Sequence, residues 1–80
     1  MKVDYPPRRS RLSETPSDVR RAFFKQVAYL ETDLRDPSLH AKKYDESRDR
    51  WQARVNRDWR FYFSIVEDTY IIRDIIPHPK

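Results

Sequence analysis

Apolar side chains recur with a helical period in the first half of the chain and with a strand period in the second half. Between residues 16 and 34 they follow at intervals of four, four, three and four, in the order Val19, Phe23, Val27, Leu30 and Leu34. This spacing predicts one amphipathic helix over residues 16–34. Thr15 is expected to be its N-cap and Pro16 its first residue. Pro37 should end it, because proline disfavours helical geometry in the residue before it.

Beyond residue 50 apolar and polar residues alternate, which is typical of half-buried strands. Strands are predicted over residues 51–55, 59–66 and 69–76, and the short polar segments 56–58 and 67–68 join them as hairpins. A long helix and a three-stranded antiparallel meander together predict an α+β fold. The apolar stripe of the helix should lie across the aromatic face of this sheet.

The remaining segments complete the predicted organisation. Residues 37–44 are expected to form a short second helical segment. Residues 1–15 are interpreted as an N-terminal arm or edge segment that could add a fourth strand, with Pro6 and Pro7 unable to donate to a sheet ladder. Residues 16–80 then make a single domain, because an 80-residue chain builds only one core.

The lengths of the two connections fix which residues face each other across the sheet. A three-residue connection pairs Arg54 with Arg60, and a two-residue connection pairs Tyr62 with Arg73. The face turned away from the helix is then predicted to carry no carboxylate and to collect, around Tyr62, the side chains Arg50, Arg54, Arg60 and Arg73.

Four arginines on one face indicate a polyanionic partner, although a solvated polar face is the alternative. Like charges opposite each other destabilise a sheet, and the chain has 13 acidic residues that could have neutralised them within a net charge of +4. Guanidinium groups bind phosphate oxygens in pairs, and Tyr62 offers a plane on which a base can stack. Lys42 and Lys43 could contact neighbouring phosphates, or could form a solvated pair beside acidic residues.

Composition excludes several other classes of function. The chain has no cysteine and no glycine, so it has no disulfide, no cysteine-ligated metal and no glycine-rich phosphate loop. No cofactor and no metal site are predicted. No apolar run approaches the roughly 20 residues that span a bilayer, so we expect a cytoplasmic protein without a membrane partner.

If the bound phosphate belongs to RNA, the ribose 2′-OH can attack it, provided that one group removes a proton and another protonates the leaving 5′-oxygen. Arg54, Arg60 and Arg73 are suited to stabilise the charge that grows on the phosphate. His78, between two prolines, is the first candidate for the proton carrier, or else a surface residue of the tail. His40 is interpreted as a capping or packing residue. Tyr62 could act as a base only if nearby arginines lower its pKa.

Several stretches resemble one known family. They read Leu-His-Ala-Lys-Lys-Tyr at 39–44, Trp-Gln-Ala-Arg-Val at 51–55, Asp-Trp-Arg-Phe-Tyr-Phe-Ser-Ile at 58–65 and Ile-Ile-Pro-His at 75–78. In order and spacing they resemble the RelE/ParE superfamily of toxins from bacterial type II toxin–antitoxin systems, over residues 16–78. The resemblance implies helices packed on an antiparallel sheet whose opposite face is active.

Carried over by residue, Arg60 is similar to the strand-start arginine of the RNase branch, and Arg54 falls where that branch has a basic residue. His78 is similar to the C-terminal histidine of the YoeB-like members. The chain departs from the family at Gln52, where RelE has a lysine, and at Pro79, where YoeB has a tyrosine.

The resemblance implies a toxin that cleaves mRNA on the ribosome without a metal and is neutralised by an acidic antitoxin protein. Its catalytic residues would be Arg54, Arg60, Tyr62 and His78, and its RNA-binding residues Lys42, Lys43, Arg50 and Arg73. Two alternatives remain open. One is a ParE-like inhibitor that binds DNA gyrase without nuclease chemistry, and the other is a degenerate member that only binds its antitoxin.

Overall fold

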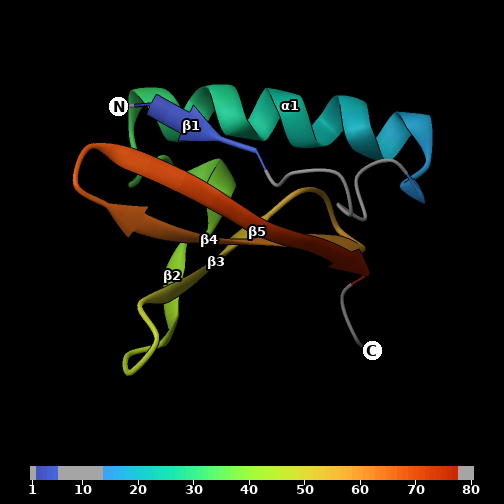
Figure 1. Ribbon diagram of the computed structural model, residues 1–80. Helices are drawn as coiled ribbons and strands as arrows, with labels where there is room; N and C mark the ends of the chain where they lie inside the picture. The colour runs from blue at the N-terminus through green and yellow to red at the C-terminus, as the bar shows by residue number, and fades with distance from the viewer. Residues whose placement is uncertain (1, 6–13, 78–80) are drawn as a thin grey trace.

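The computed structural model describes residues 2–5 and 14–77. Its elements are β1 (Lys2–Asp4), α1 (Ser17–Thr32), the 3-10 turn η2 (Pro37–Leu39), β2 (Lys42–Asp45), β3 (Arg50–Arg54), β4 (Trp59–Val66) and β5 (Thr69–Pro77). α1 lies over one face of a single sheet with the strand order β1-β5-β4-β3-β2 (Figure 1). The predicted α+β class is confirmed, but the sheet has five strands and is mixed, because β1 runs parallel to β5.

The long helix is confirmed with shorter ends than predicted. α1 begins at Ser17, and Pro16 is its N-cap, with a non-helical ψ of 147°. The prediction of Thr15 as the N-cap is therefore wrong by one residue, since Thr15 is buried and the Pro16 carbonyl accepts the first helical bond, from the Arg20 N–H at 2.9 Å.

Within the described parts of the chain, no helix is long and apolar enough to cross a membrane.

The predicted second helical segment over residues 37–44 is wrong beyond its first three residues. Only Pro37–Leu39 form a 3-10 turn, which ends at His40 in the left-handed conformation with φ of 47°. The following residues form the edge strand β2, antiparallel to β3. The exposed backbone edge of β3 explains this outcome, because its unpaired N–H and C=O groups are satisfied by an added strand.

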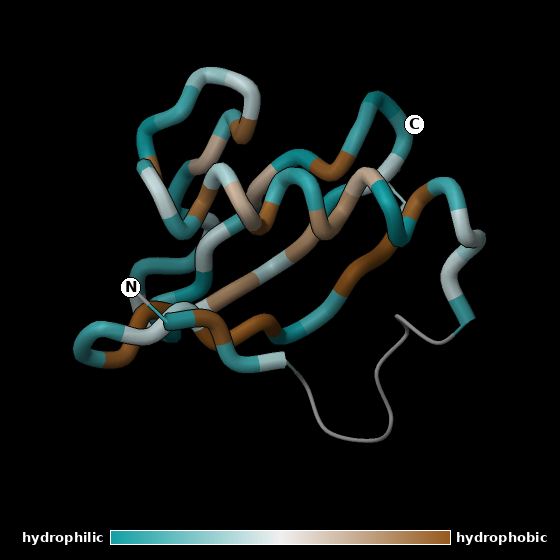
Figure 2. Tube along the Cα trace, turned by 90° about the horizontal axis from the view of Figure 1, so that it is seen from above, coloured by the Kyte–Doolittle hydropathy of each residue, from teal (hydrophilic) through white to brown (hydrophobic). Residues whose placement is uncertain are grey.

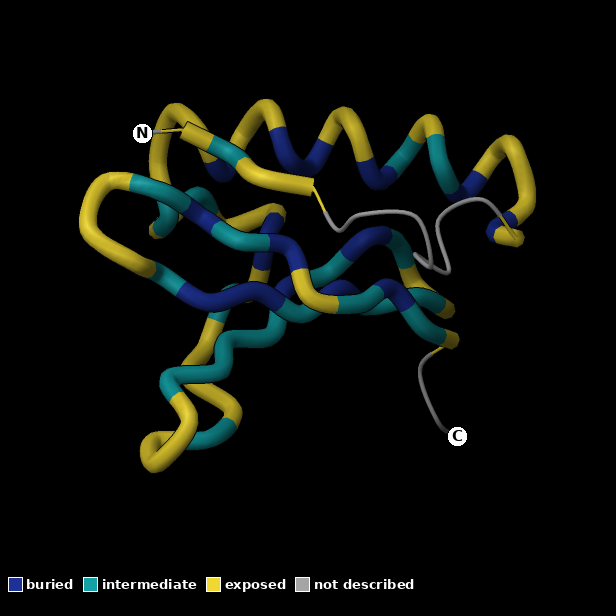
Figure 3. Tube along the Cα trace, viewed as in Figure 1, coloured by how far each residue is buried: buried dark blue, intermediate teal, exposed yellow. Residues whose placement is uncertain are grey.

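The core lies between α1 and the sheet face that it covers. Phe23 of α1 packs edge-on against Phe61 of β4, with ring centroids 5.3 Å apart. α1 runs over the strands (Figure 2), and the buried segments of helix and sheet face each other (Figure 3). The core contains the buried side chains Val19, Phe23, Val27, Leu30, Leu39, Ala53, Val55, Phe61, Phe63, Tyr70, Ile72 and Ile75. The predicted apolar stripe and aromatic face are therefore the two halves of one core.

The predicted register holds for the first hairpin and fails in part of the second. Arg54 pairs with Arg60 as expected. In the β4–β5 pair, a bulge between Tyr62 and Phe63 places Asp74, rather than Arg73, opposite Tyr62, and Arg60 faces Ile76. A bulge inserts one extra residue into one strand. The outer face of the sheet therefore does carry a carboxylate, contrary to the prediction.

The chain has no glycine, so other residues must occupy its left-handed turn positions. Among the described residues His40, Asp49 and Glu67 have positive φ, between 47° and 56°. Such a conformation costs a residue with a Cβ about 1 kcal/mol or more. Glu67 is exposed at the β4–β5 turn, so its strain can be tested without changing the core.

We expect Glu67→Gly to raise the free energy of unfolding by about 1 kcal/mol, because glycine adopts positive φ without a steric penalty. The measurement is the midpoint of urea unfolding followed by circular dichroism. Asp68→Gly is the matched control, since Asp68 is in the same turn but has no positive φ, and it should lower stability. Equal effects of the two substitutions would contradict the strain argument.

Candidate functional site

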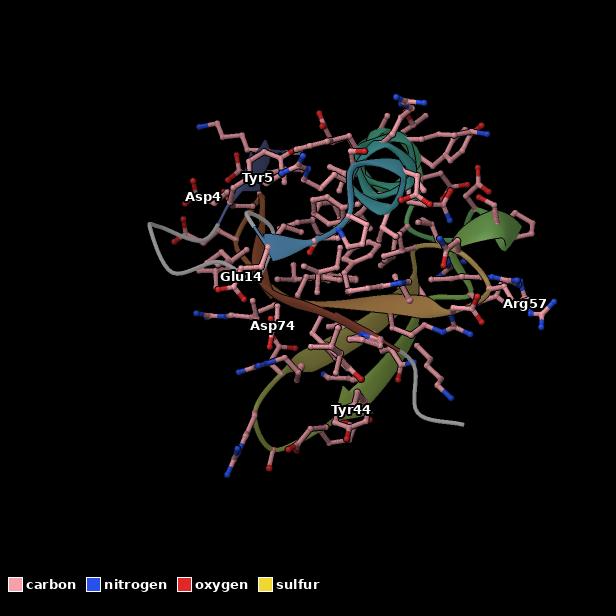
Figure 4. All side chains as sticks on the ribbon, turned by 90° about the vertical axis from the view of Figure 1, so that its right-hand side faces the viewer. Asp4, Tyr5, Glu14, Tyr44, Arg57 and Asp74 are labelled. Carbon is pink, nitrogen blue, oxygen red and sulfur yellow. The ribbon has the colours of Figure 1, made fainter. Side chains whose placement is uncertain are left out.

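The sheet face turned away from α1, called the outer face below, carries polar, charged and aromatic side chains. Tyr44 and Asp74 point to this side of the sheet, away from the helix (Figure 4). Strand register and alternation place further residues on the same face: Lys42, Asp45, Arg50, Gln52, Arg54, Arg60, Tyr62 and Ser64. The structure thus brings most of the predicted site residues together.

One end of the outer face is hollowed by a cleft of about 430 Å³. Its lining combines the segment that leads into β2 with the side chains of β3 and β4. The lining residues are His40, Ala41, Lys42, Gln52 and Arg60. The cleft therefore holds two cations, a neutral amide and an imidazole in contact with solvent.

A buried glutamine of the helix fixes the wall of this cleft. Gln26 Nε2 donates to the carbonyl oxygens of Ser38 and Arg54, both at 2.9 Å. These two bonds join α1 to the η2 turn and to the end of β3. Since His40 follows directly on η2, these bonds hold the turn that precedes the imidazole against the end of β3.

Arg60 has both a structural and an electrostatic part in the site. Its Nη1 donates to the carbonyl oxygens of Asn56 at 2.6 Å, Trp59 at 2.8 Å and Arg57 at 3.3 Å, which close the β3–β4 turn. All three bonds use the same nitrogen. Partial burial lowers the pKa of the Arg60 guanidinium, and the positive charge of Arg54 acts in the same direction. An anion at this position would relieve that repulsion.

Tyr62 is a poor candidate for the base. Partial burial raises the pKa of its phenol, Tyr44 and Asp74 raise it further, and the opposing effect of Arg60 is smaller than that of burial. Arg60 does lower the pKa of Tyr62, as expected, but burial outweighs it, so the pKa is raised on balance and Tyr62 is not activated as a base. The Tyr62 ring instead meets the ring of Tyr44, with centroids 5.3 Å apart and an interplanar angle of 67°.

At the other end of the outer face, Arg73 Nε donates to Ser64 Oγ at 3.1 Å, so the bulge keeps Arg73 on this face. Arg50 lies one position beyond the Trp51–Phe63 pair, level with Ser64. The Nε of Arg50 is buried and has no hydrogen-bond partner among the described residues. A buried donor without an acceptor is costly, and a phosphate oxygen is an acceptor that would satisfy it.

Lys43 does not join this set. Its ammonium lies 5.9 Å from the centre of the Trp51 ring, on the face that carries Phe63, and is 3.3 Å from the Asp49 carboxylate. Lys42, its neighbour in the edge strand, is on the outer face and lines the cleft. His78 lies outside the described residues.

Two residues of the site, Tyr44 and His40, have no clear signal in the sequence. Tyr44 is 62% exposed and falls in the segment 37–44 that is predicted to be helical. Strand alternation would have placed it on a face, but a bulge in β2 interrupts that alternation. His40 is predicted as a capping or packing residue, and it is the C-cap of η2. It sits in a turn, where neither periodicity can assign it to a face.

At the level of sequence, no protein-family model and no curated protein matches this chain. Solved structures do match its fold. A YoeB/ParE toxin from Agrobacterium tumefaciens superposes with a TM-score of 0.75 at 10% identity, covering 99% of this chain and 100% of the other. The YoeB–YefM toxin–antitoxin complex from Staphylococcus aureus gives 0.73 at 8% identity over 99% and 98%. A copper-bound mutant toxin from Helicobacter pylori gives 0.65 at 11% identity over 98% and 94%.

The chain therefore has the fold of the YoeB/ParE toxins, and the resemblance found in its sequence is confirmed at that level. The outer face and its cleft are presented on that fold by β2, β3, β4 and β5.

We expect Gln26→Met to lower the free energy of unfolding by about 2 kcal/mol, because the side chain keeps its volume but leaves two carbonyl oxygens without their donor. Lys25→Met is the matched control on the exposed side of the same turn, and should change stability by less than about 0.5 kcal/mol. Urea unfolding measures both. Equal losses in the two variants would contradict a specific role for Gln26.

Proposed function

We propose that this protein is the toxin of a type II toxin–antitoxin system and cleaves mRNA on the ribosome. The outer face carries the proposal, because it combines cations, the exposed ring of Tyr44 beside Tyr62, and a cleft on the fold of known toxins. Guanidinium and ammonium groups attract the phosphates, and the tyrosine rings offer stacking surfaces to unpaired bases. This combination suits single-stranded RNA better than a duplex, whose bases are already stacked.

The proposed reaction needs no group beyond side chains and the RNA itself. The 2′-oxygen forms a bond to the neighbouring phosphorus while the bond from phosphorus to the 5′-oxygen breaks. Arg54 and Arg60 stabilise the negative charge that develops on the phosphate, and Arg73 and Arg50 hold the strand farther along. His78 remains the proposed proton carrier from the C-terminal segment, and Lys42 remains a proposed phosphate contact, whereas Lys43 lies on the opposite face beside Asp49.

The proposed partners follow from the charge of the protein. A net charge of +4 and a cationic outer face favour an acidic antitoxin protein that covers this face and blocks RNA. The YoeB of Staphylococcus aureus forms a complex with YefM, which supports a partner of that kind. The ribosome, mRNA and the cytoplasm are the proposed setting.

One observation favours the alternative class, a ParE-like inhibitor of gyrase or a member that only binds its antitoxin. Tyr62 is held in its neutral form, and Gln52 stands in the cleft as a group that cannot exchange a proton readily. Neither residue supplies acid–base chemistry at neutral pH. A nuclease must therefore find its proton carriers elsewhere.

The test is to incubate the protein with translating ribosomes and to map the 5′ ends of the mRNA. We expect cleavage by the wild type and a loss of about 10²-fold in rate for Arg54→Gln, because one stabilising contact to the developing charge is removed. Lys25→Gln removes one positive charge from the exposed surface of α1 and should cleave at the wild-type rate.

DNA supercoiling by gyrase is assayed in parallel with mRNA cleavage. Intact mRNA together with inhibited supercoiling would replace the nuclease proposal by gyrase inhibition. Intact mRNA and normal supercoiling would leave a protein that only binds its antitoxin.

Tyr44 is expected to contribute binding through its exposed ring. Tyr44→Ala should weaken the binding of a single-stranded, 2′-deoxy-substituted RNA by about 5-fold to 100-fold, since one base stacked on an aromatic ring contributes about 1–3 kcal/mol. Tyr44→Phe keeps the ring and should bind within about twofold of wild type. Tyr29→Ala, which removes an exposed ring on α1, is the control, and equal weakening by this variant would contradict the assignment.

A further inference from the structure

The cleft at the end of the outer face contains one side chain that can both accept and donate a proton near neutral pH. It is lined by His40, Lys42, Gln52 and Arg60, together with Ala41. Lysine and arginine side chains are cationic there, and an amide does not exchange protons at a useful rate. Histidine is the side chain whose ordinary titration lies in this range.

The position of His40 relative to Arg60 follows from the cleft that both residues line. Lys42 pairs with Gln52 across the β2–β3 ladder, and Arg54 pairs with Arg60 across the next ladder. His40 precedes β2 and lies outside this ladder, at the end of the η2 turn. It lines the same cleft as Lys42, Gln52 and Arg60, so a phosphate held by Lys42 and Arg60 would lie beside it.

The backbone at His40 is held in a costly conformation by the structure around it. Its φ of 47° and ψ of 40° are left-handed, and its N–H donates to the Pro37 carbonyl at 3.3 Å. Gln26 fixes the η2 turn on its other side through the Ser38 carbonyl. Strain of this kind persists only where neighbouring contacts impose it, and it is common at functional sites.

From this arrangement we infer that His40 is a catalytic residue that accepts the proton of the RNA 2′-OH in the cleft, with Lys42 and Arg60 holding the phosphate. The inference rests on the proposed function. As the proton moves to the imidazole, the 2′-oxygen bonds to phosphorus and the 5′-oxygen leaves, taking a proton from water or from a second acid. The products are a 2′,3′-cyclic phosphate and a free 5′-OH.

The choice of His40 over the other candidates rests on the structure of the face. Tyr62 meets Tyr44 instead of lining the cleft, and its phenol is kept neutral by burial. One terminal nitrogen of Arg60 donates to carbonyl oxygens of the β3–β4 turn. The guanidinium is a donor only, so it cannot accept the proton. Among the described residues that line the cleft, the imidazole is the one group suited to take the proton.

The experiment is His40→Gly with and without added imidazole, in the ribosome assay. Glycine accepts the left-handed backbone without strain and leaves room in the cleft for a free imidazole molecule. We expect cleavage to fall by at least about 10²-fold, and imidazole at tens of millimolar to restore at least about a tenth of the lost rate. Arg54→Gln is the matched control and should not respond to imidazole.

Binding of ribosomes that carry a 2′-deoxy-substituted mRNA is measured for the same variants. Binding by His40→Gly within about threefold of wild type, with imidazole rescue of cleavage, supports proton transfer. Cleavage by His40→Gly within about threefold of wild type overturns the inference and leaves the proposed function standing. Lost binding without rescue also overturns it, because His40 would then only hold RNA. A wild type that leaves mRNA intact overturns both proposals.

Discussion

The structure depends on one constraint: a single helix can cover only one face of the sheet. The apolar stripe of α1 and the aromatic side chains of β3, β4 and β5 bury each other, and successive residues of a strand point to opposite faces. Every residue between two core positions must therefore face away from α1. Arg50, Arg54 and Arg60 owe their shared location to this alternation, and Arg73 joins them at the bulge, so the same packing that stabilises the fold also gathers the charges.

The fold was predictable where local pattern and pairing agree. The helix, the three longer strands and the register between Arg54 and Arg60 follow from periodicity and from the length of one connection. The β4–β5 register changes at a bulge near Arg73, which alternation cannot reveal. β1 was expected only as a possible edge strand within residues 1–15, and β2 was missed. Both are short edge strands, and their conformation is imposed by the neighbouring strands β5 and β3 rather than by their own sequences.

The candidate site was predictable to the extent that it lies on regular strands. Arg54, Arg60 and Tyr62 share a face as expected, but Asp74 was not foreseen among them. The cleft was beyond prediction, because it forms where a 3-10 turn meets the end of a strand through a helix glutamine. Gln26 joins three elements through hydrogen bonds to residues far away in the chain, and such bonds cannot be recognised from the local sequence. The η2 turn that precedes His40 is held by one of these bonds.

The double use of Arg60 bears on how an inactive form of this protein could be obtained. Its Nη1 donates to three carbonyl oxygens of the β3–β4 turn. Replacing Arg60 would therefore remove a cation from the outer face and also weaken the hairpin that carries it. A well-folded variant with an altered outer face is better obtained by changing side chains that take no part in a turn. For the same reason, variants at this arginine would tend to yield less folded protein.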